Sequence, residues 1–342
     1  MTSPAPLTSF NDIRALMEAL PGADDAARAA TQSHDAELTK PAGALGRLEE
    51  LSAWAAAWQG VHPPRADKVL LCVFAGNHGV AARGVSAYPA EVTAQMVQNF
   101  IRGGAAINQL CEAADVEMRV YEMALDQPTA DFTIAPAMSE EECVQAFTYG
   151  MAAVDLDADL LCLGEMGIAN TTSAAALCAG LFKGSGADWV GSGTGIDAQG
   201  LARKAQTIDT ALAFHGAAMG DPFDVLRHLG GRELAAITGA VLAARLARVP
   251  VLLDGFACTA AAAVLDAAQA GALDHCRVGH VSAEPGHAGL LEKIGQSALL
   301  NLNMRLGEGT GALLALGLVR AAIDCHRGMA TFAEAGISEK ED

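Results

Sequence analysis

Five short, almost wholly apolar runs constrain the fold of this chain most strongly, and alanine-rich stretches with helical spacing separate them. Strands that are buried on both faces have this composition, and they occur in parallel sheets covered by helices. The predicted strands are residues 68–75, 117–123, 159–164, 249–254 and 275–282. We therefore expect an α/β fold whose right-handed connections place the carboxyl ends of all strands at one edge of the sheet.

The two ends of the chain have a different pattern. Apolar residues recur at helical spacing between Leu45 and Trp58, and Gly60 ends this predicted helix before the first strand. The stretches 311–326 and 331–335 also have helical patterns, so we expect the terminal helices to pack together as a small helical domain. The predicted parts are 1–64 (first part of the small domain), 65–300 (parallel α/β domain) and 301–342 (a turn and helices that complete the small domain).

The composition excludes several classes of function. With 22 Lys and Arg against 40 Asp and Glu, the net charge of −18 disfavours nucleic acid as a partner. No apolar run reaches the ~18 residues that a membrane-spanning helix needs. The first ten residues lack a basic region followed by an apolar run, so we expect a cytoplasmic protein. The eight cysteines are spread out without a CxxC pair, which predicts reduced core cysteines and no structural metal.

The loop after the first predicted strand, residues 75–97, is longer than a turn requires. It mixes glycines with polar and aromatic residues, and long ordered loops in compact domains are usually functional. For His78 alone, a hydrogen-bonded structural role is the favoured interpretation.

Two further loops have features of phosphate-binding sites. Gly167 precedes Asn170 and Thr171 at a predicted helix start, where free N–H groups and hydroxyls bind phosphate. Ordinary N-capping is the alternative. The loop 190–204 repeats the pattern and adds Lys204, which favours phosphate binding. Neither loop matches the P-loop or the dinucleotide-binding motif.

Acidic residues gather at the same edge of the predicted sheet. Each carboxylate could be a helix cap, but together they predict a negative site suited to a cationic group. Arg305 lies close to the last of them in a glycine-bracketed turn, for which an exposed ion pair is the alternative interpretation. The four acidic residues are Glu165, Asp254, Glu284 and Glu308.

A series of motifs, in order from about residue 40 to 337, resembles the nicotinate-nucleotide:dimethylbenzimidazole phosphoribosyltransferase family. Asn77 stands where the GDHGV form of the first loop would have Asp. The motifs are KPAGALGRLE (40–49), AGNHGVAARGVSAYPAEVTAQMV (75–97), GEMGIANTTSAAAL (164–177), GTGID (193–197), LLDGFACTAAA (252–262), SAEPGH (282–287), MRLGEGTGA (304–312) and MATFAEAGI (329–337).

This resemblance implies a Rossmann-like parallel sheet with a small helical domain, in a cytoplasmic homodimer. It also implies an enzyme without metal or cofactor that converts nicotinate mononucleotide and dimethylbenzimidazole into α-ribazole 5′-phosphate for cobalamin. It does not specify whether the preferred accepting substrate is a benzimidazole, a purine or a phenol. It implies that Glu308 is the general base, the residue that takes up the proton. It also implies that Ser86, Tyr88 and Gln95 lie near the aromatic substrate, dimethylbenzimidazole. It further implies that the nucleotide is surrounded by Glu165, Gly167, Gly193, Lys204, Gly255, Ser282 and Arg305. From the analysis of the loops, we also expect Asn170, Thr171 and Asp254 to contact the nucleotide.

The implied roles agree with the chemistry. The pyridinium ring of nicotinate mononucleotide is already an activated leaving group, so no general acid is needed, and a single Glu can take the benzimidazole proton. Attack from the opposite face inverts C1′. Two alternatives stay open: nucleotide hydrolysis with Glu308 activating water, and a non-catalytic nucleotide-binding protein.

Overall fold

The computed structural model describes residues 7–338, in which five strands form a parallel sheet in the order β2-β1-β3-β4-β5. All five predicted strands are present, and β4 and β5 are shorter than expected. The strands are β1 (Val69–Ala75), β2 (Glu117–Glu122), β3 (Leu160–Met166), β4 (Val251–Leu253) and β5 (Cys276–Val278). The expected α/β class with a parallel sheet is confirmed.

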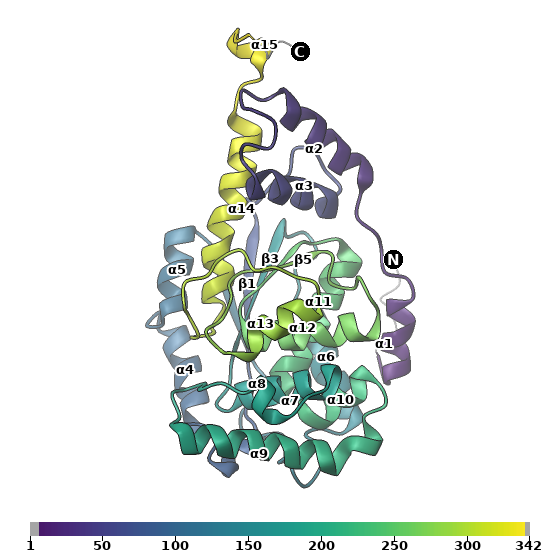
Figure 1. Cartoon of the computed structure of the whole chain (residues 1–342), viewed down its shortest axis with the longest axis vertical. Coiled ribbons are helices and arrows are strands. Elements are labelled where there is room, and N and C mark those ends of the chain that lie inside the picture. The colour runs from purple at the N-terminus through teal and green to yellow at the C-terminus, as the bar shows by residue number, and fades with distance from the viewer. Residues whose placement is uncertain (1–6, 339–342) are drawn as a thin grey trace.

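Helices cover both faces of this sheet (Figure 1). They are α1 (Phe10–Met17), α2 (Asp25–Glu37), α3 (Arg47–Gln59), η1 (Gly79–Arg83), α4 (Glu91–Ile101), α5 (Ala106–Ala114), α6 (Glu140–Ala152), α7 (Asn170–Phe182), α8 (Gly186–Trp189), α9 (Ala198–His215), η2 (Gly216–Ala218), α10 (Pro222–Leu229), α11 (Arg232–Ala247), α12 (Phe256–Ala268), α13 (Gly286–Lys293), α14 (Thr310–Gly328) and α15 (Phe332–Ala335).

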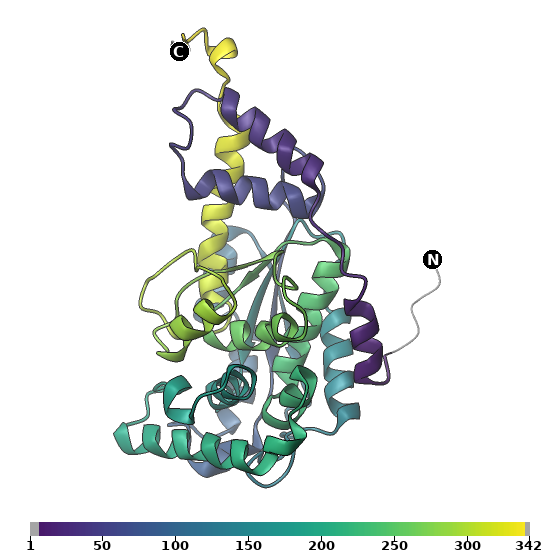
Figure 2. The same ribbon diagram turned by 45° about the vertical axis from the view of Figure 1, so that its right-hand side comes forward.

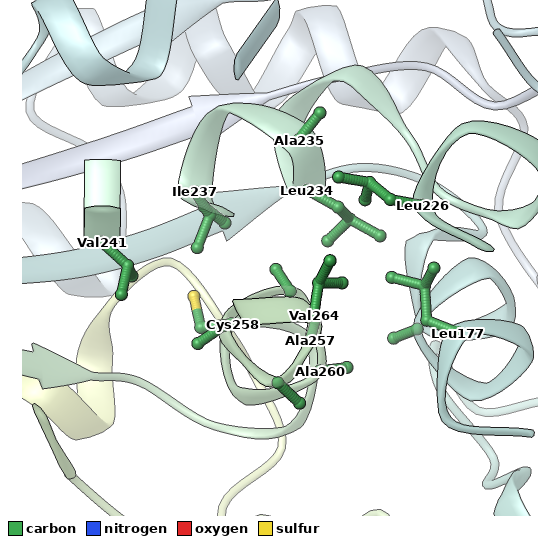
Figure 3. Close-up of a cluster of buried hydrophobic side chains, with 14 of the residues drawn as sticks. Leu177, Leu226, Leu234, Ala235, Ile237, Val241, Ala257, Cys258, Ala260 and Val264 are labelled. Atoms are coloured by element: carbon green, nitrogen blue, oxygen red, sulfur yellow. The ribbon is translucent and has the colours of Figure 1, made fainter. Parts of the chain in front are cut away.

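Strand side chains alternate between two hydrophobic cores. In β1, Leu70, Cys72 and Phe74 belong to the core beneath α6, α7, α11 and α12. Leu71 and Val73 point to the core formed with α3, α5 and α14. Figure 3 shows part of the first core, where small side chains of α12 face larger ones of α11 and α7, so the helices approach closely.

The second strand departs from the expectation that every strand is buried on both faces. β2 lies at one edge of the sheet and, within the described part of the chain, pairs only with β1. Its residues are partly or fully exposed, from Glu117 to Glu122. An edge strand has one free side and less helix cover, so it tolerates the charged residues that interrupt this run.

Helices from both ends of the chain lie side by side above the sheet. α14 runs upward from the sheet to α3, and α2 packs beside α3 (Figures 1 and 2). α1 instead contacts the α/β part, where Phe10 stacks on Phe223 with ring centroids 5.7 Å apart. Because α1 lies apart from α2 and α3, and α14 contacts both parts, the division at residues 64/65 and 300/301 stays a prediction.

The cysteines are unpaired, and all but Cys325 are buried. Burial raises the pKa of the Cys111 thiol to about 11. Across residues 7–338, no group of His, Cys, Asp or Glu side chains has a metal-binding arrangement. Within the same range, no helix combines the length and the apolar character needed to cross a bilayer.

Candidate active site

A cavity of about 470 Å³ opens at the carboxyl edge of the sheet. Its size is within the usual range for small-molecule sites. The loops after β1, β3, β4 and β5 and the turn before α14 all contribute to its wall. Thirteen of the residues predicted for the site line it: Ser86, Tyr88, Glu165, Gly167, Asn170, Thr171, Gly193, Asp254, Gly255, Ser282, Glu284, Arg305 and Glu308.

Glu308 lies in the turn immediately before α14. Its side chain is buried, and within the described residues Oε2 has no hydrogen-bond partner. Its backbone has a φ of 66°, a left-handed conformation that costs free energy for a residue with a side chain. The Glu308 N–H donates to the carbonyl oxygen of Glu165 at 3.1 Å, which fixes the turn to the end of β3.

Asp254, at the end of β4, fixes the same turn from another direction. Its Oδ2 accepts from the N–H of Gly309 at 3.0 Å, and its Oδ1 accepts from the N–H groups of Gly311 at 2.6 Å and Ala312 at 3.2 Å. Asp254 therefore caps the N-terminus of α14 from outside the helix, whose own N-cap residue is Gly309. Although Asp254 lines the cavity, three backbone donors already use its oxygens, so its direct effect is to position Glu308.

Burial raises the pKa values of Glu165, Asp254 and Glu308, and the charge of Asp254 adds to the shifts of the two glutamates. Burial, reinforced by the charge of Asp254, raises the pKa of Glu165 to about 8, and the hydrogen bond from Asn170 opposes this shift. Burial also raises the pKa of Glu308, and again Asp254 adds to the shift. Burial raises the pKa of Asp254 to about 7, against the effect of its three N–H donors.

Lys204 lies behind the cavity wall. It is fully buried on α9, and its Nζ donates to Thr171 Oγ1 at 2.8 Å and to the carbonyl oxygen of Gly191 at 3.1 Å. Burial lowers the pKa of Lys204 to about 8, although the charge of Glu284 opposes the shift. Lys204 does not line the cavity, because Thr171 and Gly193 stand between its ammonium group and the open space, so its assignment to the nucleotide stays a prediction.

The loop after β5 completes this side of the cavity. The N–H of Gly193 donates to Glu284 Oε1 at 2.8 Å, and Ser282 Oγ accepts from the N–H of Glu284 at 3.2 Å. His287 fixes the loop from beneath, since its Nδ1 accepts from the N–H of Ser282 at 2.8 Å and its Nε2 lies 3.1 Å from Thr259 Oγ1. Burial lowers the pKa of His287 to about 3, so this histidine is neutral.

The segment 85–88 forms an exposed part of the wall. Ser86 Oγ lies 2.9 Å from Thr194 Oγ1, which also accepts from the N–H of Ala87 at 2.9 Å. Tyr88 lines the cavity and is 56% exposed. Gln95 does not line the cavity. Its position on α4 is exposed, whereas Val92 and Met96, one turn apart, line the cavity.

His78 and Asn77 lie outside the lining. His78 is buried, with Nε2 at 2.7 Å from Glu233 Oε1 and Nδ1 at 3.0 Å from Ser173 Oγ. This is the structural role favoured for it. Asn77 Nδ2 donates to the carbonyl oxygen of Leu125 at 2.9 Å, a contact that an Asp carboxylate could not make. Arg305 is exposed and donates to the carbonyl oxygen of Gly193, and the described residues contain no Arg305–Glu308 ion pair.

Sequence reasoning missed the apolar part of the lining and two polar side chains. On α4 the i, i+4 spacing of Val92 and Met96 is the one sequence signal that could have found a member of this group. The missed residues include Val85, Val92, Met96, Met166, Ile168, Phe256, Leu306, Thr194 and His280.

Comparisons with known proteins agree with this architecture. A family model described as phosphoribosyltransferase matches residues 20–337. A Rhizobium meliloti (strain 1021) protein named nicotinate-nucleotide–dimethylbenzimidazole phosphoribosyltransferase is 55% identical over 97% of this chain and 98% of that protein. A Sinorhizobium medicae (strain WSM419) protein of the same name is 56% identical over the same shares.

The structural comparison gives the same result. The crystal structure of CobT from Thermus thermophilus matches with a TM-score of 0.87 and 43% identity, covering 92% of this chain and 100% of that chain. The resemblance noted in the sequence motifs is thus confirmed along nearly the whole chain. This chain belongs to the nicotinate-nucleotide–dimethylbenzimidazole phosphoribosyltransferase family.

Proposed function

We propose that this chain transfers the phosphoribosyl group of nicotinate mononucleotide to 5,6-dimethylbenzimidazole or a related base, giving nicotinate and α-ribazole 5′-phosphate. The names of its relatives support the reaction. One observation supports the mechanism most: Glu308 presents a carboxylate with an unpartnered Oε2, among residues 7–338, at a cavity large enough for both substrates.

The chemical step needs one proton acceptor. One benzimidazole nitrogen attacks C1′ while the C1′–N bond to nicotinate breaks, and its electron pair neutralises the pyridinium ring. The proton on the other benzimidazole nitrogen passes to Glu308. Burial raises the pKa of Glu308, which brings its basicity closer to the operating pH, where a general base is most effective. Attack from the face opposite nicotinate inverts C1′.

The other proposed roles follow from the wall of the cavity. The N–H groups at the start of α7 would hold the 5′-phosphate beside the loop at Gly193, whose own N–H already donates to Glu284, and the charge of Lys204 behind Thr171 would add attraction. With a pKa raised to about 8, Glu165 is protonated at neutral pH and can donate a hydrogen bond to the ribose. Tyr88, Val92 and Met96 would contact the base.

Nicotinate release, measured with and without a benzimidazole, tests the reaction. We expect release that depends on the base, with α-ribazole 5′-phosphate as the co-product. Equal release without the base would indicate a hydrolase instead. Binding of nicotinate mononucleotide without release under either condition would indicate a non-catalytic binding protein.

We also propose that the enzyme is a cytoplasmic homodimer without a cofactor, as the family resemblance implies. Closed two-fold dimers are the commonest oligomers of soluble enzymes. Light scattering at micromolar concentration should give twice the chain mass. A mass near 35.0 kDa that substrates do not change would contradict the dimer.

A further inference from the structure

A second hollow, of about 430 Å³, lies at the amino edge of the sheet, opposite the active-site edge. It is lined by residues of α2, α3, the end of α11 and the start of β5. Figure 1 places α2 and α3 above the sheet, whereas α7 and α9 lie below it. The hollow shares no lining residue with the catalytic cavity.

Two arginine side chains in this hollow stack on two tryptophans. The guanidinium of Arg245 lies 4.3 Å from the ring centroid of Trp58. That of Arg277 lies 5.1 Å from the centroid of Trp54. Stacking on the indole rings fixes the two guanidinium planes before any ligand arrives.

Arg245 has no hydrogen-bond or ion-pair partner within residues 7–338, although the residue is only 6% exposed. Its Nε and Nη1 and the Nε1 of Trp54 are buried donors without an acceptor. Leaving such groups unpaired costs free energy, most of all for a charged side chain. Burial accordingly lowers the pKa of Arg245.

The carboxylates of the hollow attract the two arginines from a distance, but neither pairs with them. Glu50 pairs with Arg47 at 3.5 Å, and Asp274 is exposed. Among the described side chains, neither carboxylate lies within 4.0 Å of Arg245 or Arg277. Arg277 donates from Nη1 to the carbonyl oxygens of Cys276 and Asp274, at 2.8 and 3.3 Å. The chain has a large excess of carboxylates, with a net charge of −18, yet none of the described carboxylates forms an ion pair with the buried guanidinium of Arg245.

We propose that this hollow binds a phosphate group, with Arg245 and Arg277 as its charged donors. Arg28, on α2, lines the same hollow and can add a third charge from the opposite wall by leaving its ion pair with the exposed Asp25. Three guanidinium groups and an indole N–H supply more donors than a carboxylate accepts, and they match the oxygens of a phosphate. The volume admits either inorganic phosphate or a small phosphate monoester.

Calorimetric titration of the full chain tests the proposal, with inorganic phosphate and ribose 5-phosphate as separate probes and chloride and acetate as references at equal ionic strength. We expect saturable phosphate binding that neither reference reproduces. The Arg245→Met substitution should weaken it by about 10- to 100-fold, because a charged hydrogen-bond donor is lost. A monoester that binds more tightly than phosphate would identify an ester as the ligand, and the reverse would identify free phosphate.

Two controls separate this site from other effects. Arg248→Met removes one positive charge just after α11, outside the hollow, and should leave binding unchanged. Lys204→Met should weaken binding on the phosphate side of the catalytic cavity, where the probes can also bind, and should leave the binding that depends on Arg245 unchanged. If Lys204→Met lost phosphate binding while Arg245→Met kept it, the phosphate would bind in the catalytic cavity and the proposal would be wrong. The absence of saturable binding would also overturn it.

If Arg245→Met does not fold, Arg277→Met and Trp54→Phe provide the same test with smaller changes. Each should weaken phosphate binding, since one removes a guanidinium and the other only the unpartnered indole N–H. Crystals soaked with selenate should show anomalous density beside Arg245 and Arg277. Wild-type affinity in both variants, or density elsewhere only, would overturn the site.

Discussion

Two parts of the active-site wall, the turn that carries Glu308 and the segment 85–88, are held in opposite ways. In the turn, Glu308 and Gly309 are buried, and backbone hydrogen bonds to Glu165 and Asp254 fix them to two neighbouring strands. In the segment, Ala87 and Tyr88 are exposed, and Ser86 and the N–H of Ala87 both contact one hydroxyl, that of Thr194. The fold therefore fixes Glu308, the proposed proton acceptor, much more firmly than the segment 85–88, which we assign to binding of the aromatic substrate.

This difference has a functional consequence. Proton transfer requires a carboxylate at hydrogen-bond distance from one atom, and small displacements are costly. Binding an aromatic ring requires mainly an apolar surface, which an adjustable segment can supply for rings of different shape. Substitutions at the turn should therefore reduce turnover, and substitutions at the segment should change affinity for the base.

Replacing Glu308 by Gln should have the largest effect. The amide keeps the shape but cannot accept the proton, so we expect turnover to fall by about 10²- to 10⁴-fold while both substrates still bind. Turnover and binding titrations should be measured together. In the wild type, kcat should decline below a pH set by the raised pKa of Glu308. More than about a tenth of the wild-type rate in the variant would exclude base catalysis by Glu308.

Gly164→Ala should move the same carboxylate without changing it. A Cβ at this β3 position would overlap the backbone nitrogen of Gly309 and lie 2.6 Å from the carbonyl carbon of Glu308. A shift of about 1 Å can reduce turnover by ~10²-fold. Gly317→Ala is the matched control, because within α14 its Cβ would meet no atom within 4 Å. Equal rates in the two folded variants would show that the position of the turn does not limit turnover.

The sequence was sufficient to predict the sheet, because apolar runs of strand length have few other solutions. It was also sufficient to predict which loops meet at its carboxyl edge. It could not predict that Asp254 caps α14, since that contact joins residues 55 positions apart along the chain. It could not predict that Gln95 lies outside the lining, because the face of a helix depends on where the helix begins, and α4 begins at Glu91; the assignment of Gln95 to the aromatic base stays a prediction. Nor could it predict that Lys204, expected near the phosphate, lies behind the cavity wall, because that distance depends on how α9 packs against the wall.

Lys204→Met should have the next largest effect, on the proposed phosphate side. We expect the affinity for nicotinate mononucleotide to fall by about 10- to 100-fold, while nicotinate riboside, which lacks the phosphate, loses little. Lys204 has a pKa of about 8, so its ammonium form declines as the pH rises through 8. Wild-type affinity for the nucleotide should decline with it, and the variant should show no such decline. Equal losses for both ligands would contradict a phosphate role.

The smallest effect should come from Ser86→Ala, which removes a single neutral hydrogen bond at the exposed segment. Such a bond contributes little, so we expect KM for the base to rise by about 2- to 10-fold with kcat nearly unchanged. Thr194 Oγ1 keeps the N–H of Ala87 as a partner, so the segment should remain attached. Thr194→Val removes both contacts and should raise KM for the base further. If Ser86→Ala instead reduced kcat as strongly as Gly164→Ala, the segment would be part of the catalytic geometry, and the contrast between the two parts of the wall would be wrong.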